Sequence, residues 1–200
     1  MSTRRRTIGI LAVASMLALG GCTGGAKKPE PLVSASVDTP TTASPTTTRI
    51  PSVPSVAKPE RPADMDRTDE VGAGAAAKYF LELYPYMMKT GDFSEWDALS
   101  WDNCQYCAES RALAVKFRDD DFVLMDGQVS AQIVTVHSLD LNFDAYPVDL
   151  ITHQLPGSIL DSSALRVGSV DEATISTRVD VKLDDSRWKM IAVANVGAKS

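Results

Sequence analysis

The C-terminal stretch ATISTRVDVKLDDSRWKMIAVA, residues 173–194, sets the architecture that the rest of the chain must fit. Apolar and polar residues alternate from Ala173 to Leu183, and a side-chain period of two is typical of a β-strand with one buried face. Asp184-Asp185-Ser186 consists of turn-forming residues. In the strand predicted after this turn, one face holds Trp188, Met190, Ala192 and Ala194. A long antiparallel hairpin is therefore expected at the end of the chain.

The residues before this hairpin also follow the period of a strand. Strands are predicted at residues 122–125, 129–141 and 143–153, with a short irregular segment at 163–167. Asp126-Gly127 is typical of a hairpin turn, and Pro156-Gly157 predicts a second turn. Pro147 indicates an edge strand or a bulge, because proline cannot donate to the ladder.

A helical period precedes the strands. One face of the helix predicted over residues 71–88 holds Val71, Ala75, Ala76, Phe80, Leu83, Tyr84, Met87 and Met88. Asp66 or Thr68 can cap its start, and Gly91 can close its end. Pro85 is expected to bend this helix, because it removes one backbone hydrogen bond.

Two shorter helices are predicted next. Residues 92–95 have the capping-box pattern, and Trp96 and Leu99 are expected to point inward from the helix that follows. A third helix is expected to start at Ser100 or Asp102. Its buried face is predicted to hold Cys104, Cys107, Ala108, Ala112 and Val115, with Phe117 near the same face.

Helices followed by an antiparallel sheet define the α+β class, with one domain at residues 67–200. Two or three helices, a sheet of four to six strands and a closing hairpin with a tryptophan near its turn resemble the cone-shaped NTF2-like fold. The resemblance implies that the first helix lies across the concave face of the sheet. A cystatin-like or other single-layer α+β sheet is the alternative.

The N-terminal third of the chain has a different composition. Residues 1–21 read as a signal peptide, with Arg4-Arg5-Arg6 followed by an apolar segment from Ile8 to Leu19 that is too short to span a bilayer as a helix. Leu19-Gly20-Gly21-Cys22 resembles the lipobox of bacterial lipoproteins. The resemblance implies cleavage before Cys22, acylation of its thiol, and a lipid anchor on the extracytoplasmic face of the cell membrane.

Two alternatives to the lipobox stay open. One is an ordinary secretory signal with a chance cysteine, and the other is an uncleaved single-span anchor. The general secretory route fits better than the twin-arginine route, because Thr7 and Gly9 interrupt the twin-arginine pattern.

Residues 22–66 are predicted to be a disordered tether. Eight of the 11 prolines lie between Pro29 and Pro62, and the segment holds no aromatic residue. Such a composition buries too little apolar surface to offset the entropy of ordering. Removal of residues 30–60 is therefore expected to leave the melting temperature of the domain unchanged.

The chain as a whole resembles a family of uncharacterised actinobacterial lipoproteins. The shared features are the lipobox, the Thr/Pro-rich tether, a helix ending in Thr90-Gly91-Asp92, the pair in Cys104-Gln-Tyr-Cys107, and a sheet that ends in an Arg-Trp strand. The resemblance implies an NTF2-like domain and brings no assigned activity.

Cys104 and Cys107 are expected to form a structural disulfide. The domain is predicted to be exported to an oxidising compartment, and an even pair remains once Cys22 is acylated. A thiol–disulfide redox site is one alternative, with Cys104 as the attacking thiol. Half of a metal site is another, although no second cysteine pair exists and His137 and His153 are single residues on strands.

Charge and motifs narrow the possible functions. From Arg67 onward the chain has 12 basic and 21 acidic residues, a net charge of −9, which argues against binding nucleic acid. No motif indicates a catalytic set, a metal or a cofactor. Asp102, Asp140, Tyr79 and Tyr146 cannot be placed in a pocket from the sequence. Six large side chains are predicted either to line a cavity inside the cone or to fill the core: Phe80, Tyr84, Met87, Met88, Trp188 and Met190.

These features predict a membrane-anchored, non-enzymatic binding or interaction domain. Its expected partners are membrane lipid through Cys22 and an envelope protein or a small apolar ligand. An NTF2-like enzyme or an envelope redox protein is the alternative.

Overall fold

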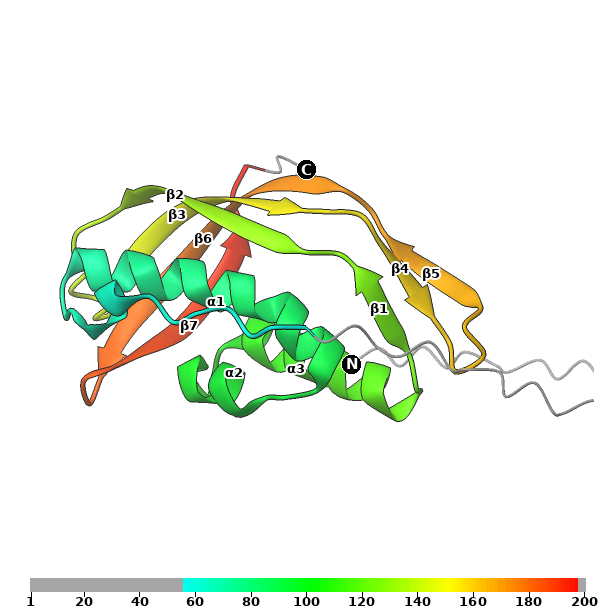
Figure 1. The fold of residues 1–200 in the computed structure, drawn as a ribbon. Helices are drawn as coiled ribbons and strands as arrows, with labels where there is room; N and C mark the ends of the chain where they lie inside the picture. The colour runs from blue at the N-terminus through cyan, green and yellow to red at the C-terminus, as the bar shows by residue number, and fades with distance from the viewer. Residues whose placement is uncertain (1–55, 198–200) are drawn as a thin grey trace, which may run out of the picture. The chain divides into compact units, whose positions relative to one another are not determined.

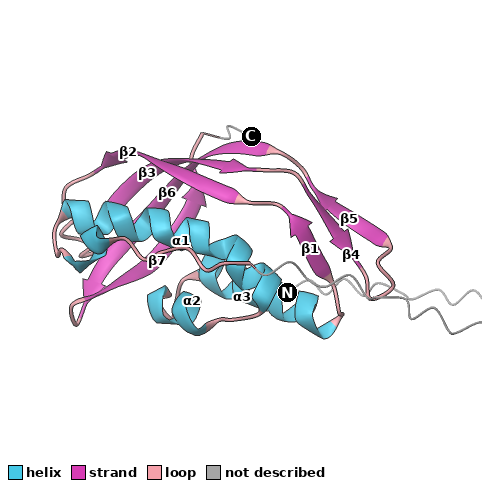
Figure 2. Ribbon diagram, in the orientation of Figure 1, coloured by secondary structure: helices cyan, strands magenta, loops and turns pink. Residues whose placement is uncertain are grey.

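The computed structural model describes residues 56–197, which form helices and two antiparallel sheets (Figure 1) (Figure 2). The elements are η1 Ala63–Asp66, α1 Glu70–Thr90, α2 Ser94–Leu99, α3 Gln105–Asp119, β1 Val123–Asp126, β2 Val129–Val136, β3 Tyr146–Gln154, β4 Gly157–Leu160, β5 Arg166–Val170, β6 Ala173–Asp184 and β7 Arg187–Asn195. The predicted α+β class is confirmed, and so is the closing hairpin of β6 and β7.

The two sheets follow one another along the same chain segments, with a bend between them. The four-stranded sheet has the order β2-β3-β6-β7, and the three-stranded sheet has the order β1-β4-β5. Two residues separate β1 from β2, β3 from β4, and β5 from β6, so the same three passes of the chain run through both sheets. Backbone hydrogen bonds cross the break, from Gly127 N to the Pro156 oxygen (3.1 Å) and from Leu155 N to the Gln128 oxygen (2.8 Å). The bend curves the sheets around α1 (Figure 1).

The hairpin predicted at Asp126-Gly127 is wrong. β1 pairs with β4, and β2 pairs with β3. Both residues have left-handed backbone angles, with φ of 59° at Asp126 and 70° at Gly127. Here they redirect a strand from one sheet into the next and do not reverse it.

The edge strand or bulge predicted at Pro147 is also wrong, because β3 is an inner strand and its pairing with β6 has no register shift. β3 lies between β2 and β6, and Pro147 pairs with Asp180 of β6. Pro147 is the second residue of β3. The pairing of β3 with β2 starts only at the next residue, Val148, which lies opposite Val136. No residue of β2 lies opposite Pro147, so the missing N–H group breaks no hydrogen bond between these strands, and the Pro147 carbonyl oxygen still accepts one from His137 N (2.9 Å).

A bulge in the closing hairpin changes which side chains of β7 face inward. The register shifts between Asp180 and Val181, so that Val181 pairs with Met190 while Val179 pairs with Val193. Val179 and Val181 are both buried, which places Val193 on the inner side. Ala192 and Ala194 therefore do not share a face with Trp188 as the alternation predicted.

Helix α1 begins and ends at specific capping residues. Asp69 is its N-cap, and the carboxylate accepts hydrogen bonds from Val71 N (3.2 Å) and Gly72 N (3.3 Å). The sequence prediction of Asp66 or Thr68 was therefore wrong. Gly91 ends the helix as predicted, with φ of 66°. Pro85 lies inside α1 without ending it.

Small residues let α1 lie close to the inner face of the four-stranded sheet (Figure 1). A Cβ atom on Gly72 would lie 2.2 Å from the Arg67 oxygen and 2.9 Å from Trp188 Cζ2. Farther along, Phe80 stacks on Trp96 of α2, with ring centroids 4.1 Å apart. Val71, which was predicted on the buried face, is exposed.

The two short helices close the other side of the core. The capping box predicted at residues 92–95 is wrong, because the N-cap of α2 is Phe93 and no side chain caps the helix; Asp92 only accepts a hydrogen bond from Ser94 N (3.0 Å). Trp96 and Leu99 are buried as predicted. Helix α3 starts after Cys104, later than Ser100 or Asp102. Its buried residues are Cys107, Ser110 and Ala114, so the predicted face with Ala108 and Ala112 is wrong.

Residues 56–66, which we call the strap, lie against the domain. They run beside α1 (Figure 1) and include the buried Met65. Lys58 forms an ion pair with Glu95 of α2, and the Tyr79 hydroxyl donates to the Pro59 oxygen (3.5 Å). Residues 22–66 were predicted to be a disordered tether, and for the strap this prediction is wrong. The predicted signal peptide, Cys22 and the part of the predicted tether up to residue 55 lie outside the described residues.

No helix within residues 56–197 is both long and apolar enough to cross a membrane.

Candidate ligand site

A cavity of about 200 Å³ lies on the concave side of the four-stranded sheet. Every strand of that sheet contributes to it, together with α1 and α3. Its lining residues are Leu81, Tyr84, Tyr106, Val129, Thr152, Gln154, Ile175, Thr177, Val193 and Asn195. Because all the elements around it are regular and packed, the cavity is held by the fold and not by a loop.

A pair of threonines provides the polar part of the cavity wall. Thr152 of β3 donates a hydrogen bond to Thr177 of β6, with the two hydroxyl oxygens 3.1 Å apart. The two residues are only 9% and 4% exposed. Each hydroxyl has further hydrogen-bonding capacity, so the pair can also bond a ligand. The amides of Gln154 and Asn195 add further donors and acceptors.

The two tyrosines of the cavity stay neutral at physiological pH. Burial raises the pKa of the Tyr84 hydroxyl above its usual value, and burial raises the pKa of Tyr106 to about 12. No lining residue carries a charge. The cavity can therefore exchange hydrogen bonds with a ligand, but it holds no group that gains or loses a proton near pH 7.

The structure separates the six side chains that were predicted as possible lining. Phe80, Met87, Met88 and Met190 are buried in the core, as the filled-core alternative expected. Tyr84 lines the concave cavity. Trp188 borders a different hollow beside Met65 of the strap and Leu99 of α2. The six residues therefore form no common pocket.

Sequence reasoning missed most of the cavity wall. Thr177 was placed on the alternating face of its strand, and a threonine at an inward position is a signal for a polar group in the interior. Tyr106 gave no such signal, because the predicted face of its helix was wrong. Asp102, Asp140, Tyr79 and Tyr146 do not line the cavity.

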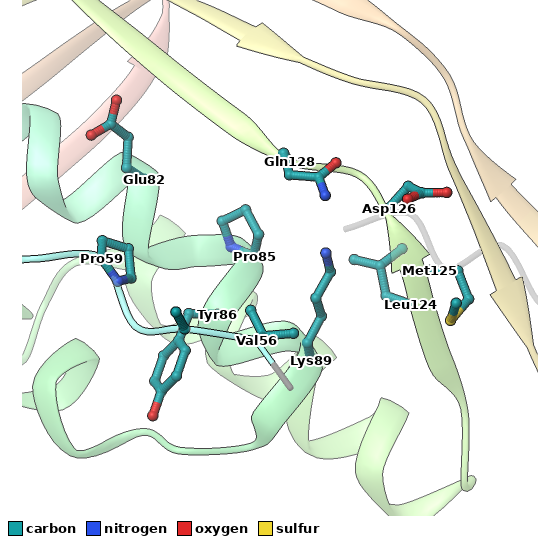
Figure 3. Close-up of a pocket in the computed structure, with 11 residues that line it drawn as sticks. Val56, Pro59, Glu82, Pro85, Tyr86, Lys89, Leu124, Met125, Asp126 and Gln128 are labelled. Atoms are coloured by element: carbon teal, nitrogen blue, oxygen red, sulfur yellow. The ribbon is translucent and has the colours of Figure 1, made fainter. Parts of the chain in front are cut away.

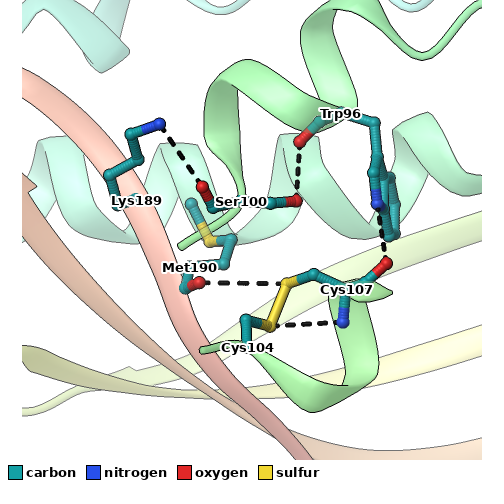
Figure 4. Close-up of a disulfide and its surroundings, with 6 residues drawn as sticks. All are labelled: Trp96, Ser100, Cys104, Cys107, Lys189 and Met190. Carbon is teal, nitrogen blue, oxygen red and sulfur yellow. Dashed lines mark hydrogen bonds between the residues drawn. A yellow bond between two sulfur atoms is a disulfide. The ribbon is translucent and has the colours of Figure 1, made fainter. Parts of the chain in front are cut away.

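Cys104 and Cys107 form a disulfide at the start of α3 (Figure 4). Cys104 is the N-cap, and its sulfur accepts a hydrogen bond from Cys107 N (3.2 Å). The Trp96 indole donates to the Cys107 oxygen (3.1 Å), and Cys107 Sγ lies 3.8 Å from the Met190 oxygen. The disulfide therefore closes the first turn of α3, and the contacts of Cys107 with Trp96 and Met190 hold that turn against α2 and β7.

The surroundings of the disulfide favour a structural role. The two cysteines are 1% and 2% exposed, whereas a redox site needs a sulfur that a partner thiol can reach. Within residues 56–197, no three His, Cys, Asp or Glu side chains form a possible metal site. His137 lies beside Asp149, and His153 lies beside Thr174.

Comparison with known proteins gives a family and a fold. A family of unknown function, DUF6318, matches residues 44–194. A similar solved structure is the intermembrane space region of the chloroplast protein ARC6, with a TM-score of 0.52 and 12% identity. The match covers 66% of this chain and 99% of that chain, and at this identity it shows a shared fold alone. No curated protein matches the sequence.

Proposed function

This chain belongs to DUF6318, a family of unknown function, and we propose that it is an exported lipoprotein whose folded domain binds a small uncharged ligand. The domain is of the NTF2-like type in this proposal, with α1 across the concave face of the sheet. Cys22 carries the lipid anchor, and the residues up to 55 form the tether that holds the domain outside the cell membrane.

The N-terminal sequence supports the anchor. Leu19-Gly20-Gly21-Cys22 follows a basic and then an apolar segment, in the order that lipoprotein maturation requires. At about 0.8 kcal/mol per buried CH₂ group, two acyl chains hold a protein firmly where one chain does not. The Cys104–Cys107 disulfide supports export as well, because such bonds persist in oxidising compartments.

The concave cavity carries the proposal of ligand binding. Its wall combines apolar side chains with a few fixed hydrogen-bonding groups, which is the usual make-up of a small-molecule site. Its volume of about 200 Å³ suits a small ligand. Because the lining has no charged group, the ligand is uncharged, with an apolar body and a hydroxyl or carbonyl group facing Thr152 and Thr177.

The same lining favours binding over catalysis. Proton transfer in a cavity needs an acid or base whose pKa lies near the working pH. Here two tyrosines with raised pKa values and no carboxylate line the cavity. The buried sulfurs likewise argue against the redox alternative.

The anchor is tested by a Cys22→Ala substitution in the full chain. We expect this variant to appear in the soluble fraction or as an unprocessed precursor, measured by cell fractionation and intact mass. Wild-type protein should gain the mass of the acyl groups and stay with the membrane. A Cys22→Ala variant that is processed and membrane-bound like the wild type would contradict the anchor.

The ligand is tested by analysis of what co-purifies with the protein. An organic extract of wild-type protein, purified from producing cells, should contain a small uncharged compound detectable by mass spectrometry. Val193→Phe places a larger side chain in the cavity and should prevent that compound from binding. Val134→Phe, the same change at an exposed position of β2 that does not line the cavity, is the control. Equal amounts in both variants would contradict the proposal.

A further inference from the structure

A second cavity, of about 320 Å³, lies between the strap, α1 and β1 (Figure 3). Most of its wall is apolar, and the apolar side chains come from all three elements. They are Val56 and Pro59 of the strap, Pro85 of α1, and Leu124 and Met125 of β1. It shares no lining residue with the concave cavity.

Lys89 brings a positive charge into this apolar cavity. It lies in the last turn of α1, where a lysine ordinarily interacts with the carbonyl groups of the helix end. Its side chain instead reaches into the cavity (Figure 3). Within residues 56–197 the Lys89 ammonium has no hydrogen bond or ion pair. Burial also lowers the pKa of Lys89, because a charged group is less stable away from water.

A second donor faces the same space. The exposed Gln128 side-chain amide points toward the Lys89 ammonium (Figure 3), and it forms no side-chain hydrogen bond within residues 56–197. An ammonium and an amide that face each other across a gap suit one shared acceptor between them.

Neither of the two carboxylates that line the cavity, Glu82 and Asp126, bonds to Lys89 or Gln128 in the described part of the chain. Glu82 already accepts hydrogen bonds from Ala131 N (3.0 Å) and the Lys78 ammonium (2.6 Å). Asp126 lies near enough to favour the charged form of Lys89, but it forms no ion pair with Lys89 in the described part of the chain. Within the described lining, therefore, neither carboxylate accepts a hydrogen bond from the Lys89 ammonium or the Gln128 amide.

We propose that this cavity binds a carboxylate attached to a short apolar group, with the carboxylate between Lys89 and Gln128 and the apolar group against Leu124 and Met125. A free short-chain acid and the C-terminus of an apolar peptide both carry this chemistry. The site is separate from the concave cavity, so either proposal can fail alone.

The test uses the Met125 methyl group, which lines the cavity, as a local reporter. The full chain with Cys22→Ser is labelled at its methionine methyl groups and titrated with hexanoate by NMR. We expect a saturable shift at Met125 and none at Met87 or Met190, which lie in the core. Hexan-1-ol has the same tail without the charge, and it should bind at least about tenfold more weakly.

Two lysine variants separate the charge from the apolar wall. Lys89→Met keeps the length of the side chain and should weaken hexanoate binding about tenfold. Lys116→Met makes the same change at an exposed lysine of α3 and should leave the affinity unchanged. Unchanged Met87 and Met190 signals in both variants show that the fold is intact.

N-acetyl-leucine, in the same titration, represents a peptide C-terminus. A lower Kd for N-acetyl-leucine than for hexanoate would identify a peptide C-terminus as the source of the carboxylate, and the reverse order would identify a free short-chain acid. Three results would overturn the proposal: no saturable shift at Met125 with either acid, equal binding of hexanoate and hexan-1-ol, or equal hexanoate affinity in Lys89→Met and the wild type.

Discussion

Asp149 is the centre of a charged cluster on the face of the sheet opposite the core. Its carboxylate accepts two hydrogen bonds from the Arg178 guanidinium, at 2.7 and 2.8 Å, and His137 Nε2 lies 2.8 Å away. The hydrogen bonds from Arg178, and then that with His137, lower the pKa of Asp149 to about 2 against partial desolvation. Because the three residues lie on or beside β2, β3 and β6, the cluster ties neighbouring strands together.

Asp149→Asn should remove an acid-sensitive part of the stability. A carboxyl group with a lowered pKa stabilises the fold above its unfolded pKa of 3.8 and loses that contribution as pH falls toward 2. We expect a loss of about 1 kcal/mol at neutral pH, since the pair is partly solvated. The difference between variant and wild type should shrink from pH 4 to pH 2, measured by urea unfolding. A difference that is constant with pH would contradict this assignment.

Gly72 is expected to be intolerant of any side chain. Alanine is ordinarily favoured over glycine inside a helix by about 1 kcal/mol. At position 72, however, its Cβ would overlap the Arg67 carbonyl oxygen and the Trp188 ring. We expect Gly72→Ala to lower the free energy of unfolding by about 2 kcal/mol or more, measured by urea denaturation.

Gly74→Ala is the matched control for Gly72→Ala. Its Cβ would meet only the ends of the Val136 and Ile133 side chains, at 2.9 and 3.3 Å. The Ile133 end can turn aside and the Val136 methyl must move slightly, but no backbone atom is in the way, so we expect a smaller change, within about 1 kcal/mol. Equal losses in the two variants would show that the backbone overlap at Gly72 is not what limits the approach of α1.

The disulfide stabilises the start of α3 through a very short loop. Chain-entropy reasoning gives about 2 kcal/mol or less for a loop of this size. Cys104→Ser breaks the bond but keeps a good N-cap residue, so we expect a loss of about 1 kcal/mol and a folded protein. Cys104→Ala also removes the cap and should cost about 1 kcal/mol more. Thermal unfolding of the two variants measures the difference, and equal melting temperatures would show that the cap contributes nothing.

The elements predicted well are those whose pattern is long. Helix α1 and the β6–β7 hairpin each repeat their period over many residues, so a single irregular residue such as Pro85 does not hide them. The bend between the sheets was missed because Asp126-Gly127 favours left-handed backbone angles in a hairpin and in a redirected strand alike. Only the pairing of β1 with β4, which depends on distant residues, distinguishes the two.

The candidate sites were predictable only in part, for the same reason. The cysteine pair lies within one turn of chain, so its disulfide followed from local spacing and compartment. The concave cavity is assembled from six elements, and the β7 bulge brings Val193 into it against the simple alternation. The Lys89 cavity also needs the strap, which the sequence presents as part of a proline-rich tether.

The strap joins the proposed tether to the core of the domain. The Trp188 indole lies within 3.1 Å of the oxygens of both Met65 and Arg67, and Met65 itself is only 4% exposed. Tension on a chain anchored at Cys22 would therefore reach the strap before it reached α1. The strap also lines the Lys89 cavity, so the proposed anchor and that proposed binding site would be joined through the same segment.

Two deletions distinguish the strap from the chain before it. Removing residues 30–55 should leave the melting temperature unchanged if that segment is a tether without packing. Removing residues 30–66 takes away Met65 and leaves the Trp188 indole without its Met65 acceptor. We expect a loss of about 3 kcal/mol, or roughly 10 °C in melting temperature. Equal melting temperatures for both deletions would mean that the strap contacts contribute nothing, and a lower value for the shorter deletion would mean that the tether also packs.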